Sequence, residues 1–135
     1  MINEDIIDTM VVMAKSAINK SYSPYSGKKS GACALTSDGT LYPGSDVENA
    51  SSGLSCCAAI VAVFNAVADS KREFDAIAVV SDSDETFAPG GECCQIFAEF
   101  GIREIIIANS KGDVTVTSLE ELAPCTLGIV GGKRI

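Results

Sequence analysis

The chain has 135 residues, of which 47% are hydrophobic, so it can bury the core of one domain spanning residues 1–135. Its formal net charge of −8, without a basic stripe, argues against a nucleic-acid binder and favours a small-molecule ligand. No apolar run approaches the roughly 18 residues of a membrane span, and the acidic start Met1–Asp5 is unlike a signal peptide. We therefore expect a cytoplasmic protein with neither a membrane partner nor a nucleic-acid partner.

The first part of the chain predicts a helix, a loop and a β-hairpin. Asn3 can cap a helix in which apolar residues recur at helical spacing from Ile6 to Ile18. The polar stretch Ser21–Ser30 contains a proline and a glycine and is therefore expected to be a loop. Asp38-Gly39 then lies between two apolar runs, a pattern typical of a tight turn between antiparallel strands.

The remaining chain predicts alternating helices and strands. A helix from about Leu54 to Ala68 is apolar nearly all round, so we expect it to be buried on most sides. The later elements are expected at Asp75–Ser81 (strand), Gly91–Phe100 (helix), Glu104–Ala108 (strand), Val114–Val116 (strand) and a short helix capped by Ser118 and Glu121. Strand–helix–strand order with apolar strands predicts an α/β protein, a three-layer α/β/α sandwich with a mixed five-stranded sheet.

The six cysteines include two adjacent pairs, Cys56-Cys57 and Cys93-Cys94, whereas the chain contains no histidine. A metal site in this chain must therefore use thiolates and carboxylates, and a nucleophile has no histidine to activate it. Cys57 and Cys93 fall at predicted helix starts, where the helix dipole stabilises a thiolate. Two such helix starts placed side by side can hold one metal ion.

Four motifs in order along the chain resemble those of the cytidine deaminase family. They are Ser23–Ser26, Val47–Ser51 followed by Cys57-Ala58, Ala76–Asp82, and the set Pro89, Gly91, Cys93 and Gln95. The resemblance covers nearly the whole chain, which looks like the small, homotetrameric branch of that family. It implies the cytidine deaminase fold, a homotetramer and a zinc ion held by three cysteines. It also implies a zinc-activated water that attacks C4 of cytosine and a glutamate that carries protons.

The chain departs from the family pattern at the positions that carry this chemistry. Ala59 stands where the resemblance places the proton-carrying glutamate, and a methyl group cannot transfer a proton. Gly90 stands where it places the second zinc cysteine, so only Cys57 and Cys93 remain of three ligands. Zinc is thus the implied cofactor, and the incomplete ligand set argues against its binding.

The resemblance also identifies positions that contact the nucleoside. Lys28 replaces a base-stacking phenylalanine, and Asp46 replaces an asparagine that binds the ribose. Glu48 matches the carboxylate that binds a ribose hydroxyl, although its side chain could equally order the loop beside the predicted helix. Leu127 replaces a C-terminal phenylalanine that closes a neighbouring site. These changes predict an altered pocket for a nucleoside-like ligand.

Other residues could compensate for the missing groups. Glu92, at the start of a predicted helix, could carry protons or bind a metal, or could simply stabilise the helix N-terminus. Cys94 or Cys56 could supply a third thiolate, although adjacent side chains on a helix point about 100° apart. Cys57 or Cys93 could also act as a nucleophile.

These residues leave three hypotheses for function. The first is a cytidine deaminase-like protein that does not deaminate cytidine efficiently and retains at most a nucleoside-binding pocket. The second is an active zinc-dependent nucleoside deaminase, or a related hydrolase of a cyclic amidine C–N bond, with a rebuilt site in which Glu92 is catalytic. The third is a thiol redox or metal-binding protein that uses the paired cysteines.

Overall fold

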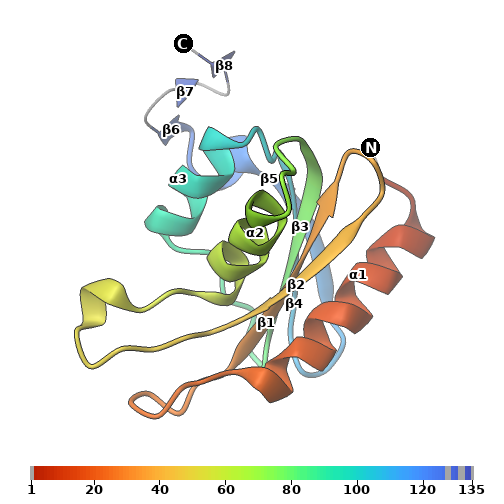
Figure 1. Ribbon diagram of the computed structural model, residues 1–135. Coiled ribbons are helices and arrows are strands. Elements are labelled where there is room, and N and C mark those ends of the chain that lie inside the picture. The colour runs from red at the N-terminus through yellow and green to blue at the C-terminus, as the bar shows by residue number, and fades with distance from the viewer. Residues whose placement is uncertain (1, 127–128, 131–132, 135) are drawn as a thin grey trace.

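A mixed five-stranded sheet forms the centre of the computed structural model, which describes residues 2–126, 129–130 and 133–134, with side chains for residues 2–124. The strand order is β2-β1-β3-β4-β5 (Figure 1). β3 and β4 run parallel, and the other neighbouring pairs are antiparallel, which confirms the sheet and the hairpin predicted from the sequence. The strands are β1 (Ser30–Thr36), β2 (Leu41–Ser45), β3 (Phe74–Ser81), β4 (Glu104–Ala108) and β5 (Val114–Ser118).

Helices cover both faces of this sheet, which confirms the three-layer α/β/α prediction. α1 packs on one face against Cys33 and Ile106, whereas α2 and α3 pack on the other around Val63 and Phe97 (Figure 1). No helix in the described part of the chain combines the length and the apolar character that crossing a membrane requires. The remaining elements are α1 (Glu4–Ala17), η1 (Ile18–Lys20), η2 (Ser52–Leu54), α2 (Ala58–Ala68), α3 (Gly91–Glu99), α4 (Leu119–Leu122), β6 (Cys125–Thr126), β7 (Ile129–Val130) and β8 (Lys133–Arg134).

Two glycines allow the helices to approach the sheet closely. A Cβ atom on Gly31 of β1 would overlap the carbonyl oxygen of Ala14 in α1. A Cβ atom on Gly44 of β2 would overlap the backbone nitrogen of Ala62 and the carbonyl oxygen of Ala58 in α2. The absence of a side chain at Gly44 therefore sets the distance between β2 and the first turns of α2.

Both N-caps predicted from the sequence are present. The Asn3 side chain accepts a hydrogen bond from the Ile6 N–H at 2.9 Å at the start of α1. The Ser118 hydroxyl accepts one from the Glu121 N–H at 3.2 Å at the start of α4. Each bond satisfies a backbone donor that the first helical turn leaves without a partner.

α2 begins later than the sequence predicted. Its first residue is Ala58 rather than a residue near Leu54, and Cys57 is its N-cap. Val47 and Cys56 exchange two backbone hydrogen bonds of 2.8 and 2.9 Å, which hold the chain extended immediately before the helix. The apolar composition of this segment could not reveal that pairing, because its partner lies on a separate segment of the chain.

α2 ends in a left-handed residue that is not glycine. Ser70 has a φ of 67°, and the N–H groups of Ser70 and Lys71 donate to the carbonyl oxygens of Val67 and Ala66, both at 3.0 Å. This is the Schellman pattern, which favours glycine at the position of Ser70 because a Cβ atom is strained there. α3 ends in the same pattern with Gly101, whose φ is also 67°.

Replacing Ser70 by glycine should therefore stabilise the fold. We expect Ser70→Gly to raise the free energy of unfolding by about 0.5–1 kcal/mol, because the strain relieved exceeds the extra freedom of glycine in the unfolded chain. Chemical denaturation of the two proteins measures this difference. The reverse change at the end of α3, Gly101→Ala, should lower the same quantity by about 1 kcal/mol. A Ser70→Gly protein no more stable than the parent would contradict this explanation.

Candidate active site

A cavity of about 530 Å³ lies where the loop before β1, the start of α2, the end of β3 and the start of α3 meet. It is at the carboxyl end of β3, which pairs in parallel with β4, and this end of an α/β sheet is where ligands usually bind. The cavity is lined by Lys28, Asp46, Cys57, Ala59, Gly90, Glu92 and Cys93, all of which the sequence analysis singled out. Glu48 and Cys94 do not line it, and Leu127 lies outside the described residues.

The two predicted helix-start cysteines meet in the wall of this cavity. Cys57 is the N-cap of α2 and Cys93 lies in the first turn of α3, 36 positions further along the chain. Their sulfur atoms lie in contact, and their Cα atoms are 7.5 Å apart. The fold therefore brings the two thiols together. This is the arrangement expected if the starts of the two helices lie side by side.

The other cysteines with described side chains lie away from the cavity. Cys94 is only 2% exposed, and its Sγ is 3.9 Å from the carbonyl oxygen of Pro89. Burial, followed by the nearby charge of Glu92, raises the pKa of the Cys94 thiol. Cys33 is fully buried under α1, and burial raises the pKa of its thiol to about 12. Neither thiol is placed to join Cys57 and Cys93 at the cavity.

The position next to the thiols carries a methyl group. Ala59 lies in the first turn of α2, is 2% exposed and contributes to the cavity wall. The carboxylate of Glu92 comes from the start of α3 instead. Its nearest oxygen is 3.4 Å from the point that a Cβ atom on Gly90 would occupy, so Glu92 borders the space that a side chain at Gly90 would use.

Asp46 connects the start of β1 to the start of α2. Its carboxylate accepts the Ala58 N–H at 2.8 Å and two hydrogen bonds from Ser30, from the N–H at 2.8 Å and from the hydroxyl at 2.7 Å. A carboxylate at this place satisfies a free donor of the first turn and interacts favourably with the helix dipole. Asp46 therefore positions the helix that carries Cys57, a contribution that its place in the sequence did not reveal.

Glu48 orders the loop before β1. One carboxylate oxygen accepts the N–H groups of Tyr25 and Ser26 at 2.9 and 3.1 Å, and the other accepts the Ser26 hydroxyl. The hydrogen bonds from Ser26, with the one from Tyr25, hold the pKa of Glu48 below its usual value. The loop that leads to Lys28 is thus held by a charged carboxylate.

Lowering the pH should release this loop. A carboxyl group whose pKa is depressed in the folded protein stabilises it above the unfolded pKa, and the contribution is lost as the pH falls through the folded pKa. We expect the Ser26 amide resonance to titrate with a midpoint below about 4.3, the ordinary pKa of glutamate, and the transition to be absent in Glu48→Gln. NMR titration measures both. A midpoint at or above the ordinary value would show that these hydrogen bonds do not favour the charged form.

The sequence of this chain matches a known protein family and several of its members. Residues 5–109 match the family model of the cytidine and deoxycytidylate deaminase zinc-binding region. The chain belongs to this family. The cytidine deaminase of Sporosarcina psychrophila is 38% identical over 120 residues, covering 87% of this chain and 88% of that protein. The probable cytidine deaminase of Dictyostelium discoideum is 32% identical over 123 residues, covering 90% and 84% respectively.

Solved cytidine deaminases share the fold of this family member. The crystal structure of the cytidine deaminase from Burkholderia pseudomallei has a TM-score of 0.83 at 42% identity, covering 88% of this chain and 97% of that one. The enzyme from Mycobacterium tuberculosis has a TM-score of 0.78 at 30% identity, covering 91% and 98%. The family and the fold expected from the sequence motifs are therefore confirmed.

The donor atoms of this deaminase-family chain do not match a three-ligand zinc centre. Among the residues whose side chains are described, no three His, Cys, Asp or Glu side chains lie close enough together to hold a metal ion. Cys57 and Cys93 supply two thiols, Gly90 supplies no side-chain donor, and Cys94 is buried elsewhere. Catalytic zinc in proteins takes three protein ligands and a water. The residues present therefore do not fit the group that the family name implies.

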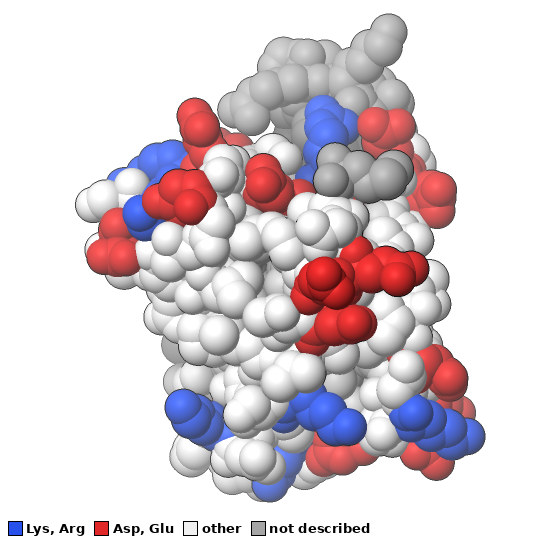
Figure 2. Space-filling model, turned by 90° about the vertical axis from the view of Figure 1, so that its right-hand side faces the viewer, with Lys and Arg blue, Asp and Glu red and all other residues white. Residues whose placement is uncertain are grey.

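Two lysines and a phenylalanine also line the cavity of this deaminase-family member. Lys28 and Lys29 line the cavity from the loop before β1, and no ion pair to their ammonium groups is found among the described residues. Figure 2 shows that acidic side chains gather on the middle of one face of the molecule, with basic ones along its lower edge.

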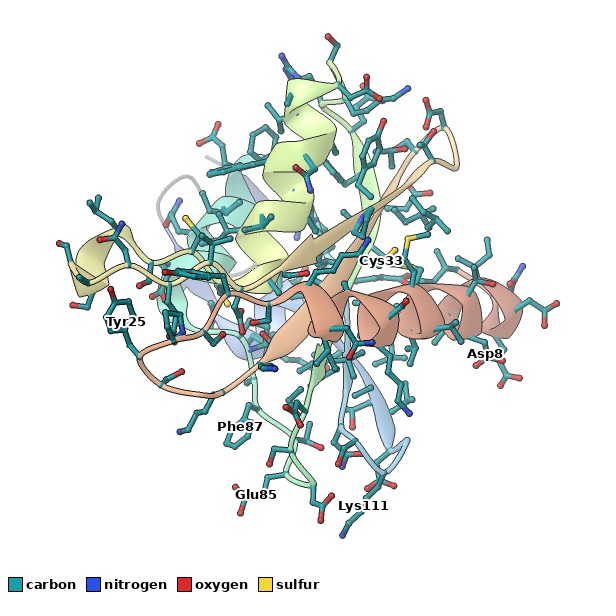
Figure 3. All side chains as sticks on the ribbon, turned by 60° about the horizontal axis from the view of Figure 1, so that its bottom comes forward. Asp8, Tyr25, Cys33, Glu85, Phe87 and Lys111 are labelled. Carbon is teal, nitrogen blue, oxygen red and sulfur yellow. A yellow bond between two sulfur atoms is a disulfide. The ribbon has the colours of Figure 1, made fainter. Side chains whose placement is uncertain are left out.

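Phe87, on the loop between β3 and α3, also lines the cavity and is labelled in Figure 3. Its place in the cavity wall was missed because a lone aromatic residue in a polar loop carries no periodic signal.

Proposed function

We propose that this chain is a nucleoside-binding member of the cytidine deaminase family that does not deaminate cytidine at a useful rate. The observation that carries the proposal is the methyl group of Ala59 in the cavity wall beside Cys57, where the reaction needs a proton carrier. Positioned acid–base groups contribute about 100- to 10,000-fold to rates, and a methyl group supplies none of this. The presence of only two thiols at the cavity supports the same conclusion.

The rest of the cavity supports a retained binding role. Its volume of about 530 Å³ lies within the range of about 300–1,000 Å³ that is typical of small-molecule sites. In this proposal Lys28 and Asp46 face the ligand from the cavity wall, and Glu48 acts through the loop that it orders. Cys57 and Cys93 are the remnant of the metal site. We propose a nucleoside as the ligand, because the relatives that match most of this chain are named cytidine deaminases.

Metal content, turnover and binding test the proposal together. Protein purified without chelators and without a tag is examined by elemental analysis, by conversion of cytidine to uridine, and by calorimetric titration with cytidine and uridine. We expect no stoichiometric zinc, no turnover above the uncatalysed rate, and saturable binding of at least one nucleoside. Efficient turnover with about one zinc ion per chain would overturn the loss of activity, and the absence of any nucleoside binding would overturn the retained role.

A second candidate function is favoured by the position of Glu92. Its carboxylate lines the same cavity and borders the space beside Gly90, so it could carry protons for a substrate other than cytidine. If this rebuilt deaminase exists, Glu92→Gln should reduce its turnover at least 100-fold. A screen of modified and charged pyrimidine nucleosides measures this. Turnover equal in the parent and Glu92→Gln proteins would reject the assignment.

The proposal also includes the oligomeric state of the protein and its cellular compartment. α2 leaves Phe64 46% exposed, and the preceding segment leaves Leu54 68% exposed, so both apolar side chains can be covered by neighbouring subunits. We place the protein in the cytoplasm as a single-domain homotetramer in which these surfaces meet. Light scattering of the purified protein checks the assembly, and a monomer would contradict it.

A further inference from the structure

Phe87 presents a half-exposed aromatic ring to the cavity. Its side chain is 50% exposed, and it is the single aromatic residue among the described residues that line the cavity. Tyr22 and Tyr25 are also exposed, at 57% and 63%, but they do not line the cavity. Figure 3 shows Tyr25 and Phe87 on different loops. An aromatic ring that stays partly in water gains free energy when a flat apolar surface covers it.

The loop that carries Phe87 is held in place by the end of β4. The side-chain amide of Asn109, which is only 3% exposed, donates to the Asp84 carbonyl oxygen at 2.9 Å and to the Thr86 hydroxyl at 3.4 Å. The Ser110 hydroxyl donates to the Asp84 carboxylate at 2.7 Å. These bonds hold the residues immediately before Phe87, so this part of the loop has little backbone freedom to lose when a ligand binds.

The cavity lining combines apolar and polar residues. Val79, Ala59 and Ala88 provide surfaces without polar side-chain atoms, whereas Ser81 and Asp82 provide hydrogen-bonding groups at the end of β3. A flat heterocycle with polar edges suits this combination, since its faces can stack and its edges can exchange hydrogen bonds. Lys28, on the loop before β1, offers a charge but no ring.

We propose that Phe87 stacks on the pyrimidine base of the nucleoside and so determines the affinity of this cavity for its ligand. The proposal rests on the nucleoside-binding role proposed above. Stacking of a base on an aromatic side chain changes affinity roughly 5- to 150-fold when the ring is removed. Phe87→Leu keeps an apolar side chain but removes the ring, and Phe87→Tyr keeps the ring.

The chain contains no tryptophan, so Phe87→Trp introduces a single fluorescent indole at the proposed stacking position. A base stacked on this indole should quench its emission. The matched control is Val116→Trp, because Val116 on β5 is 51% exposed and does not line the cavity. Titration with cytidine and uridine should quench the first variant saturably and leave the second unchanged.

Calorimetry on the parent protein separates this inference from the function on which it rests. We expect the parent and Phe87→Tyr to bind the same nucleoside within about threefold of each other, and Phe87→Leu to bind it about 10-fold more weakly. If the parent binds and Phe87→Leu binds equally well, with no quenching in Phe87→Trp, the stacking role is wrong while the binding role stands. If the parent binds neither nucleoside, both are wrong.

Discussion

Replacing Gly90 by cysteine should yield a protein that holds about one zinc ion per chain, whereas we expect none in the parent chain. The substitution adds a third thiolate to Cys57 and Cys93, which already meet at the cavity wall. Loss of a residue that merely supports a metal ligand costs about 10- to 100-fold in metal affinity. A direct ligand should contribute at least as much, so we expect Gly90→Cys to raise zinc affinity by about 100-fold or more.

The backbone at Gly90 accepts a side chain. Its φ of −72° and ψ of 174° are ordinary extended values that any residue adopts. The atom nearest to an added Cβ is a Glu92 carboxylate oxygen at 3.4 Å, which is a normal van der Waals contact with the end of a flexible side chain. The substitution therefore changes the donor set without forcing the start of α3 to move.

Competition with a zinc-binding dye and elemental analysis measure the change. Gly91→Cys is the matched control, because it adds a thiol one position further along α3, outside the cavity lining. That variant should gain no zinc beyond the parent. Equal zinc uptake by the two variants, or no uptake by Gly90→Cys, would show that Gly90 is not the position at which the third ligand is missing.

Adding Ala59→Glu to Gly90→Cys tests the other missing group. The double variant should convert cytidine to uridine at least 100-fold faster than Gly90→Cys alone, because the second change supplies the positioned proton carrier that Ala59 lacks. Initial rates at matched zinc loading measure this. A zinc-loaded double variant as inactive as Gly90→Cys would contradict the expectation and place the loss of activity in the nucleoside-contacting part of the cavity.

Replacing Gly44 by alanine should destabilise the fold strongly, because it pushes α2 away from the sheet. A Cβ atom at this position overlaps the Ala58 carbonyl oxygen and the Ala62 nitrogen, and its next neighbour, the Ala62 Cα, is 2.8 Å away. These are backbone atoms, so α2 must move away from β2 as a unit. We expect Gly44→Ala to lower the free energy of unfolding by about 3 kcal/mol, as overpacked cores do.

Chemical denaturation of Gly44→Ala and of a matched glycine variant tests this expectation. Gly53→Ala is the control, because an added Cβ there meets no atom within 4 Å. That change should alter stability by no more than about 0.5 kcal/mol. Because Cys57 caps α2, the displaced helix should also separate its thiol from Cys93. A Gly44→Ala protein as stable as the control would mean that α2 packs on β2 with room for a methyl group between them.

Local patterns in the sequence were sufficient for the elements and the family. The Asp38-Gly39 turn, the Asn3 cap and the apolar strand Glu104–Ala108 depend on neighbouring residues, so short-range rules predict them. The same is true of Ala59 and Gly90, since the motifs around them show which residue types are absent. The start of α2 was predicted too early because the pairing of Val47 with Cys56 is not local.

The arrangement of the cavity was decided by the tertiary structure. Cys57 and Cys93 meet only because α2 and α3 both begin at the carboxyl end of β3. The contact of Asp46 with the first turn of α2 and the place of Phe87 in the cavity wall likewise join segments that are distant in the chain. The sequence therefore determined which chemical groups this protein possesses and lacks. Packing of the helices on the sheet decided which of those groups face one another, because long-range contacts leave no local periodic signal.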